Sequence, residues 1–357
     1  MKIIRKKTRP VKVGSLTIGG GAPISIQSMV TTPAREVTAT VEQIQRLTEI
    51  GCDIVRVACP TEDDAKLLGK IKSKIKIPLV ADIHFHYKLA LIALDEGIDK
   101  LRLNPGNIGK KDQVAEIVRK AKRLKIPIRI GVNGGSLEKD LREKYGPTPE
   151  ALVESAGRHV RILEELDFED IVISIKTSDV GNMIAAYRLA SRKFDYPLHL
   201  GVTEAGTLMR GSVYNAVGIG TLLEEGIGDT LRVSLTADPV EEVKVGKMIL
   251  ESLGLRKGPR VISCPSCGRA EVDVIRIAEE VERRAMKLKK PLTISVLGCV
   301  VNGPGEAHES DFGITCGKGK GMIYVNGEQK RTVTAEHLVD ELFREIESAV
   351  GEKKSQS

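Results

Sequence analysis

Short apolar runs alternate with amphipathic stretches along roughly the first 250 residues. Runs rich in Ile, Val and Leu predict strands, and the stretches between them carry apolar residues at the spacing of one helix face. The predicted strands are 24–29, 54–58, 79–82, 100–104, 128–132, 171–176, 198–203 and 231–235. The clearest predicted helices are 40–50, 112–124, 150–166 and 240–253. Eight β/α units in about 250 residues are typical of a TIM barrel.

A doubly wound sheet is the alternative way to arrange such units. The first predicted strand is not followed by the G-x-G-x-x-G turn that dinucleotide-binding sheets carry, and the count of eight favours closure into a barrel. Before that strand, residues 9–20 alternate at period two around Gly14 and Ser15, which predicts a β-hairpin. We expect this hairpin to cover the bottom of the barrel.

A domain boundary is predicted near 254–259, where Gly and Pro interrupt the last barrel helix. Residues 1–253 then form the barrel and residues 254–357 a second, smaller domain. Its pattern predicts helices at 272–289 and 335–350, with strands at 292–297, 312–315, 321–325 and 328–333. The expected architecture is therefore α/β, a TIM barrel followed by a small α+β domain.

Three cysteines in the second domain indicate a metal centre. Cys264 and Cys267 lie three residues apart around a Pro-Ser turn, and Cys299 follows a predicted strand, so one loop and a second segment can grip a soft metal. The candidates for a fourth ligand are Glu306, His308 and Cys316. Cubane iron–sulfur clusters normally take four thiolates, and a non-thiolate ligand would leave one labile iron that can bind a substrate oxygen. A structural zinc site is the alternative.

Polar and charged residues follow the predicted barrel strands, where TIM barrels place their chemistry. They are Arg56, Asp82, His84, Arg102, Asn104, Arg129, Asn133, Lys176, Glu204, Arg232 and Ser234. One interpretation is that the cations fill the barrel as ion pairs with Asp82 and Glu204. The other is a pocket for two phosphoryl groups, because guanidinium forks and ammonium groups suit phosphate oxygens. The glycine turn 133–136 can add backbone N–H donors.

Glu204 is a carboxylate at a strand end among these cations. Its protonation depends on the balance of desolvation against neighbouring charge, and its expected role is that of a proton donor or general acid/base. Asp82 and His84, two residues apart, are expected to orient a substrate, and the alternative is that His84 is a buried histidine with its hydrogen bonds satisfied.

Composition narrows the class of partner. The formal net charge of +7 implies an anionic partner, which can be a phosphorylated metabolite, an acidic redox protein or nucleic acid. Aromatic residues make up only 3% and Trp is absent, which disfavours single-strand nucleic-acid binding through base stacking. There is no apolar run of 18 residues and no hydrophobic signal core after the basic N-terminus, so we expect a cytoplasmic protein with reduced thiols and no membrane association.

Several motifs resemble those of one enzyme family. Cys-Pro-Ser-Cys-Gly-Arg at 264–269 and Gly-Cys-Val-Val-Asn-Gly-Pro-Gly-Glu at 298–306 are similar to segments of the bacterial 4-hydroxy-3-methylbut-2-en-1-yl diphosphate synthases of the methylerythritol phosphate route. The resemblance extends to Asp-Ile-His at 82–84, Arg-Leu-Asn-Pro-Gly-Asn at 102–107, Gly-Val-Asn-Gly-Gly-Ser at 131–136 and Val-Thr-Glu-Ala-Gly at 202–206. It covers nearly the whole chain and matches the short, two-domain form.

The resemblance implies a reductase that opens and dehydrates 2-C-methyl-D-erythritol 2,4-cyclodiphosphate to 4-hydroxy-3-methylbut-2-enyl diphosphate. Its two electrons would come from an acidic flavodoxin or ferredoxin and pass through a [4Fe–4S] cluster held by Cys264, Cys267, Cys299 and Glu306. Glu204 would be the catalytic acid/base. The implied substrate-binding residues are Arg56, Asp82, His84, Arg102, Arg129, Asn133, Lys176, Ser234 and Asn302.

Chain direction predicts a homodimer in which the cluster domain of one subunit caps the barrel of the other, as the resemblance also implies. The last barrel helix, about 238–253, returns the chain to the bottom of the barrel over roughly 16 residues at ~1.5 Å each. The eight residues 254–261 span at most ~26–29 Å when fully extended, so a return to the same barrel's mouth would use all of them.

Two other functions remain open from the residues alone. One is a pterin-binding transferase barrel, similar to dihydropteroate synthases, with zinc in the tail. The other is a basic zinc-ribbon protein that binds RNA.

Overall fold

The computed structural model describes residues 3–84, 86–268, 270, 272–288, 290–299, 303–317 and 319–352. These fall into two compact units, residues 1–256 and 257–357, and each is described by itself. None of the helices in this part of the chain combines the length and the hydrophobicity that a bilayer crossing requires.

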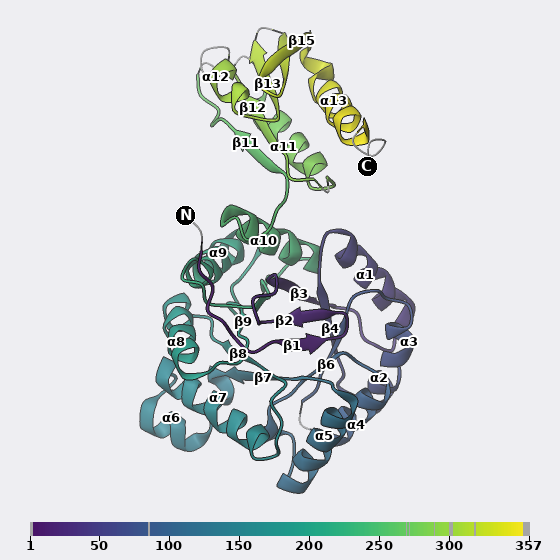
Figure 1. The fold of residues 1–357 in the computed structure, drawn as a ribbon, viewed down its shortest axis with the longest axis vertical. Helices are drawn as coiled ribbons and strands as arrows, with labels where there is room; N and C mark the ends of the chain where they lie inside the picture. The colour runs from purple at the N-terminus through teal and green to yellow at the C-terminus, as the bar shows by residue number, and fades with distance from the viewer. Residues whose placement is uncertain are drawn as a thin grey trace. The chain divides into compact units, whose positions relative to one another are not determined.

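The first unit is a nearly closed barrel of eight parallel strands surrounded by helices (Figure 1). Neighbouring strands follow in chain order, β10 pairs with β3, and a single bridge from Ile173 to Leu198 joins β8 to β9. The strands are β3 (Ser25–Met29), β4 (Ile54–Ala58), β5 (Leu79–Asp82), β6 (Lys100–Arg102), β7 (Ile128–Asn133), β8 (Ile171–Lys176), β9 (His199–Leu200) and β10 (Thr230–Leu231). The predicted TIM barrel is confirmed, although β9 and β10 are much shorter than the sequence pattern indicated.

Amphipathic helices cover the outside of the barrel. Their apolar faces and the outward side chains of the strands form one continuous core, which is the arrangement that parallel strands with helical crossovers require. The helices are α1 (Val37–Glu49), α2 (Glu62–Lys66), α3 (Leu68–Lys72), α4 (Tyr87–Asp95), α5 (Lys111–Leu124), α6 (Lys139–Tyr145), α7 (Pro149–Glu164), α8 (Val180–Lys193), α9 (Leu208–Glu224) and α10 (Pro239–Ser252).

The predicted hairpin is present as β1 (Val11–Val13) and β2 (Leu16–Ile18), which pair antiparallel. Its apolar side chains pack against Ile54, Val80 and Val172, which lie toward the N-terminal ends of three barrel strands. The hairpin therefore closes the end of the barrel opposite the strand ends where the polar residues lie.

The second unit is a five-stranded mixed sheet with helices on both faces. Strands β11 (Arg260–Ser263), β12 (Thr293–Leu297) and β13 (Phe312–Gly317) run parallel, and β14 (Lys320–Val325) and β15 (Glu328–Thr334) continue antiparallel. Helices α11 (Val274–Ala285) and α13 (Leu338–Glu352) share one core with one face of the sheet. The short helix α12 (Gly303–His308) places Ala307 against Leu297 and Tyr324. The α+β prediction is confirmed, but sequence analysis missed β11 and α12.

Candidate active site

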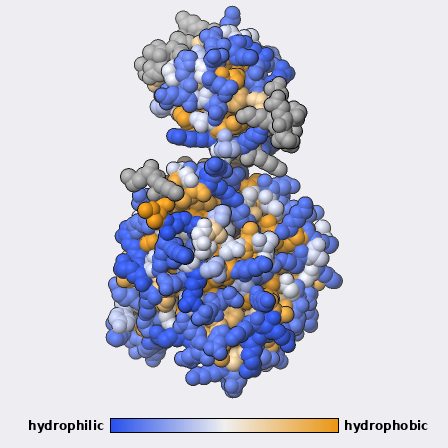
Figure 2. All heavy atoms as spheres, viewed as in Figure 1, coloured by the Kyte–Doolittle hydropathy of each residue, from blue (hydrophilic) through white to orange (hydrophobic). Residues whose placement is uncertain are grey.

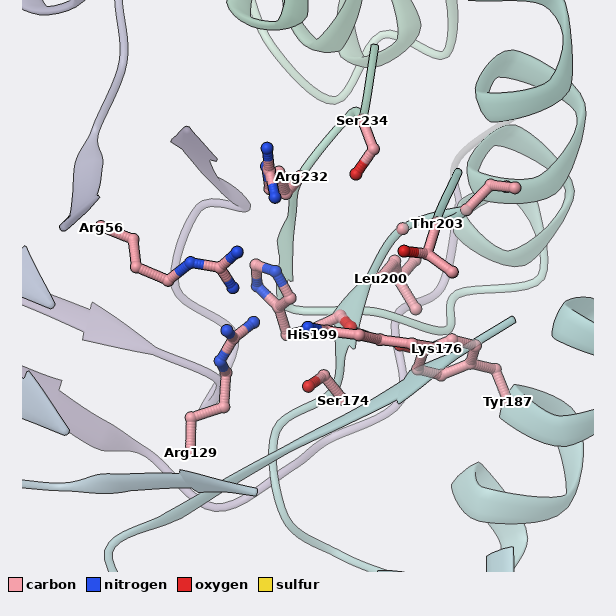
Figure 3. A pocket seen from close by; sticks show the side chains of 12 residues that line it. Arg56, Arg129, Ser174, Lys176, Tyr187, His199, Leu200, Thr203, Arg232 and Ser234 are labelled. Carbon is pink, nitrogen blue, oxygen red and sulfur yellow. The ribbon is translucent and has the colours of Figure 1, made fainter. Parts of the chain in front are cut away.

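The mouth of the barrel contains a small pocket, whose empty volume is about 340 Å³ when the space open to solvent is included. It brings together Arg56, Arg129, Lys176 and Ser234, four of the residues that the sequence predicted as phosphate or substrate contacts. Figure 3 shows the guanidinium groups of Arg56 and Arg129 directed toward the space beside His199. Because successive side chains alternate along a strand, residues two apart on each barrel strand face this same interior.

Asp82 forms an ion-pair centre at one side of the interior. Its carboxylate lies 3.9 Å from Arg56 Nε, 3.2 Å from Arg102 Nη1 and 3.4 Å from His84 Nε2. Burial alone would raise the pKa of Asp82, but Arg56, His84 and Arg102 outweigh it and hold that pKa well below its ordinary range. Arg56 and Arg102 thus pair with Asp82, as the ion-pair interpretation expects.

Arg102 is further fixed by the backbone of β7. Its Nη2 donates to the carbonyl of Gly131 at 3.1 Å, and a Cβ at Gly131 would lie only 2.8 Å from Arg102 Nε. Asn104 binds the same glycine twice, with its amide oxygen 2.8 Å from Gly131 N and its Nδ2 2.9 Å from Gly131 O. The glycine of the 131–136 motif thus makes room for Arg102.

Arg129 and Lys176 are basic side chains without such a partner among the described residues. Arg129 is fully buried, and all three of its guanidinium nitrogens lack a hydrogen-bond partner among the described residues. Burial and the nearby Arg56 lower the pKa of Arg129, yet a guanidinium keeps its proton at neutral pH because its pKa starts so high. Burial and neighbouring guanidiniums lower the pKa of Lys176 to about 6.

Sequence analysis missed several groups of the pocket. Arg232, which the sequence placed at a strand end without a role in binding, lines it and pairs with Glu242 of α10 at 3.1 Å, and Glu242, which was not predicted, also accepts a hydrogen bond from Ser28 Oγ at 2.9 Å. His199 lies in the interior with its Nδ1 unpartnered, and burial next to Arg129 keeps its pKa well below the ordinary value. His199 lies two residues before Gly201, so both positions face the barrel interior. This spacing was the signal that could have identified His199.

The structure does not bring every predicted residue into the pocket. His84 sits at the rim, with 51% of its side chain exposed, and the Asn133 side chain accepts a hydrogen bond from Gly135 N at 2.9 Å. Glu204 is exposed beyond β9 and has a φ of +54°, a left-handed conformation that is uncommon for any residue except glycine. Asn302 lies outside the described residues.

In the second unit, the cysteines gather at one edge of the sheet. Cys264 directly follows β11 and Cys299 follows β12 by two residues, and these strands are parallel neighbours, so both thiols lie at the carboxyl edge. Gly298 N–H donates to Cys264 Sγ at 3.2 Å, which ties the two segments together. Cys267 is exposed in the loop after Cys264, and Glu306 is exposed on α12.

This edge fits the chemistry of an iron–sulfur cluster. Thiolates from two neighbouring loops, one with a hydrogen bond to its sulfur, are what such clusters use. No three His, Cys, Asp or Glu side chains in the described part of the chain converge on a single ion. Such convergence on one ion is needed for a mononuclear site. A cubane does not need it, because each of its protein ligands binds a different iron.

Cys316 also lies near this edge, on β13, but points into the core. It is 1% exposed among the apolar residues shared with α11 and α13, and burial, with a smaller effect of Cys264, raises its pKa to about 11. Cys52 and Cys59 are buried in the barrel core.

Comparisons with known proteins match both units. Residues 8–247 match the GcpE TIM-barrel domain and residues 260–348 match the GcpE protein C-terminal domain. A 4-hydroxy-3-methylbut-2-en-1-yl diphosphate synthase (flavodoxin) of Caldanaerobacter subterraneus subsp. tengcongensis is 58% identical over 98% of this chain and 99% of its own. One of the same name from Geobacillus thermodenitrificans is 57% identical over 98% of this chain and 94% of its own.

The chain belongs to the 4-hydroxy-3-methylbut-2-en-1-yl diphosphate synthase family. The resemblance drawn from the motifs is thus confirmed.

A solved structure adds information on the fold of this synthase family's barrel. A dihydropteroate synthase from Stenotrophomonas maltophilia covers 68% of this chain and 98% of its own at a TM-score of 0.50 and 12% identity. At that identity the likeness shows the fold alone. The pterin-binding alternative therefore shares an architecture with this chain, while the sequence family is that of the diphosphate synthases.

Proposed function

We propose that the chain catalyses the reductive ring opening and dehydration of 2-C-methyl-D-erythritol 2,4-cyclodiphosphate to 4-hydroxy-3-methylbut-2-enyl diphosphate, a step of isoprenoid biosynthesis. Two electrons and two protons enter, the ring C–O bond breaks, and one oxygen leaves as water. The observation that carries the proposal is Arg129, a buried guanidinium that has no counter-ion among the described residues and lies in a pocket lined by further basic side chains. The name of the chain's relatives includes the product and supports the same reaction.

Phosphoryl oxygens are the proposed ligands of the pocket. Arg129 has charge to offer and Lys176 can donate hydrogen bonds, whereas Asp82 holds Arg56 and Arg102 in position from the side. A diphosphate would supply the negative charge that the interior lacks, and guanidinium forks match its oxygens. Ser234 and Arg232, from the loop after β10, complete the wall. His84, at the rim, and Asn133 remain proposed contacts for the rest of the substrate, together with Asn302.

Glu204 is the proposed proton carrier. A left-handed glutamate costs of order 1 kcal/mol of backbone strain, and strain of this kind clusters at functional sites. The preceding residue, Thr203, lines the pocket, which places Glu204 next to it in the chain. We infer that Glu204 delivers a proton to an oxygen of the substrate.

The electron-transfer group is proposed to be a [4Fe–4S] cluster bound by Cys264, Cys267, Cys299 and Glu306. When bound, it supplies single electrons to the substrate. The hydrogen bond from Gly298 to Cys264 already holds the Cys264 and Cys299 segments next to each other. Glu306 lies on α12, which follows Cys299 in the chain. An acidic flavodoxin is the proposed donor, in keeping with the relatives' name, and a ferredoxin is the second candidate.

A homodimer is proposed from the linker length and from one exposed helix face. Helix α9 leaves Leu208, Met209, Val213, Tyr214 and Val217 exposed, with Met209 at 79%. Figure 2 shows hydrophobic side chains gathered over α9 on the face in view. Apolar patches of this kind mark protein–protein contacts.

Anaerobic purification with cysteine variants tests the assignment. Wild type should be brown, should contain iron, and should form the diphosphate product from the cyclodiphosphate and reduced flavodoxin. Cys299→Ser should lose most of its iron and its activity, because one ligand is missing. Cys316→Ser is the matched control and should keep both, since that thiol lies in the core. A colourless wild-type protein containing zinc would refute the cluster, and iron loss in Cys316→Ser would overturn the ligand set.

A further inference from the structure

Lys100 is a fully buried lysine inside the barrel, one layer below the pocket. It begins β6, and it faces the same interior as Arg102 because side chains alternate along a strand. Its side chain is completely buried, and its Nζ has no hydrogen-bond partner among the described residues. A lysine in this condition is rare, since buried charges are normally paired.

Apart from Asp82, the groups around Lys100 in the described interior are cations or neutral. Arg129 of β7 and Arg56 of β4 act on it electrostatically, and Lys100 in turn acts on His199 of β9. Asp82 of β5, the carboxylate of the interior, is held by Arg56 and Arg102. On β3, which also faces the interior, Ser25 Oγ and both amide atoms of Gln27 lack partners among the described residues.

We propose that Lys100 is a positioning residue that is neutral in the free enzyme and takes up a proton when the cyclic diphosphate enters the pocket above it. The inference rests on the proposed function and deepens it. Lys100 contacts no ligand. It acts through Arg129 and through the electrostatic field of its own charge.

Electrostatics gives the reason. Burial, Arg129 and Arg56 all lower the pKa of Lys100, so the empty interior favours the neutral amine. Arg129 cannot respond in this way, because a guanidinium retains its proton. A cyclodiphosphate carries one ionised oxygen on each phosphorus, and these negative charges reverse the sign of the field. The lysine then gains a proton and strengthens binding, about tenfold for each unit by which the ligand raises its pKa.

Calorimetry tests the proposal on the cluster-loaded enzyme without reductant, so that the cyclodiphosphate binds and does not react. Binding heats in buffers of different ionisation enthalpy give the number of protons taken up. The ligand contributes none, because its acidic oxygens stay ionised near neutrality. Wild type should take up more protons near pH 8 than Lys100→Met, by about one per barrel. Lys176 contributes its own share in both proteins.

Affinity and stability give two further readouts. Because the amine is neutral when free and protonated when bound, wild-type affinity should strengthen as pH falls from 9 to 7, and Lys100→Met should show a shallower slope. The free Lys100→Met protein should melt at a higher temperature than wild type, since an unpaired buried amine has been removed. Lys122→Met, which alters an exposed lysine of α5, is the matched control and should leave proton uptake unchanged.

The outcomes separate this inference from the proposed function. If wild type does not bind the cyclodiphosphate, the phosphate pocket itself is wrong and this inference fails with it. If wild type binds but Lys100→Met takes up as many protons, only the role of Lys100 is refuted. Lys100→Gln provides the same comparison if the Met variant is insoluble. Failure of both variants to fold would show that the amine stabilises the free protein, which contradicts the proposal.

Discussion

Basic side chains inside the barrel fall into a paired and an unpaired group. Arg56 and Arg102 share the carboxylate of Asp82, whereas Arg129 and Lys100 lie in the interior without any hydrogen-bond partner in the described part of the chain. A buried cation without a counter-ion destabilises the fold, and it persists where a ligand supplies the missing charge. The interior is therefore better suited to the bound than to the empty state.

Lys176 offers a pH-dependent test of this strain. Its pKa is about 6 in the folded protein and near the ordinary 10.5 when unfolded, so between these values the unfolded chain binds more protons. Stability of the free protein should therefore rise with pH across this window. We expect Lys176→Met to flatten that rise, which thermal melts from pH 6 to 10 would show. An unchanged pH profile in the variant would mean that Lys176 is already charged when folded.

Two substitutions at Glu204 distinguish the effect of its carboxylate from the effect of its backbone conformation. Glu204→Gln should keep the cluster and substrate affinity but reduce turnover by about 10²- to 10⁴-fold, as loss of an acid/base does. Glu204→Gly should lose turnover similarly while raising the melting temperature, because glycine tolerates a positive φ. Wild-type turnover in Glu204→Gln with iron intact would remove this residue from the reaction.

The loops at the edge of the second sheet depend on how closely α11 packs against them. A Cβ at Gly298 would lie 2.2 Å from Val274 Cγ2 of α11, and the next atoms are 3.5 Å away. The helix therefore touches the turn that connects β12 to Cys299. Positions of the thiols at this edge follow from that packing.

Gly298→Ala should push α11 and the Cys299 segment apart. We expect reduced iron content after anaerobic purification, with substrate affinity of the barrel retained. Val274→Ala removes the clashing methyl group, so the double variant should recover iron that the single variant loses. Iron content equal to wild type in Gly298→Ala alone would show that the edge is more tolerant than its packing indicates.

For the whole chain, much of the net charge is internal. When an anion is bound and both lysines are protonated, Arg56, Lys100, Arg102, Arg129 and Lys176 are opposed inside the barrel by Asp82, which leaves four of the +7 formal charges there. The charge that sequence analysis assigned to an anionic partner thus points first to the substrate. Charge attraction to an acidic donor has correspondingly less support.

Subunit mixing tests the proposed shared site. Glu204→Gln subunits retain the cluster ligands, and Cys264→Ser subunits retain an intact barrel, so a heterodimer that shares sites combines one of each. We expect activity to reappear after subunit exchange, at up to about half the wild-type level per dimer because one of two composite sites is intact. Heterodimers confirmed by tag pull-down that remain inactive would refute sharing.

Met209→Lys on α9 should weaken the dimer in sedimentation experiments.

Local patterns were enough to predict the barrel, the hairpin and the α+β domain, because period-two and period-3.6 spacing directly reflects which face of an element is buried. Three strands, β4, β5 and β8, begin and end at their predicted residues. Short apolar segments such as β11, and a six-residue helix with Pro and two Gly such as α12, carry too little periodicity to be recognised.

Motifs in the sequence also identified the family and the charged residues of the pocket. Which cations have partners could not be read from the chain, because Asp82 and Arg102 meet only when β5 and β6 pair in register. The isolation of Arg129 and Lys100 has the same origin. A counter-ion is a neighbour in space, and barrel closure decides which side chains become neighbours.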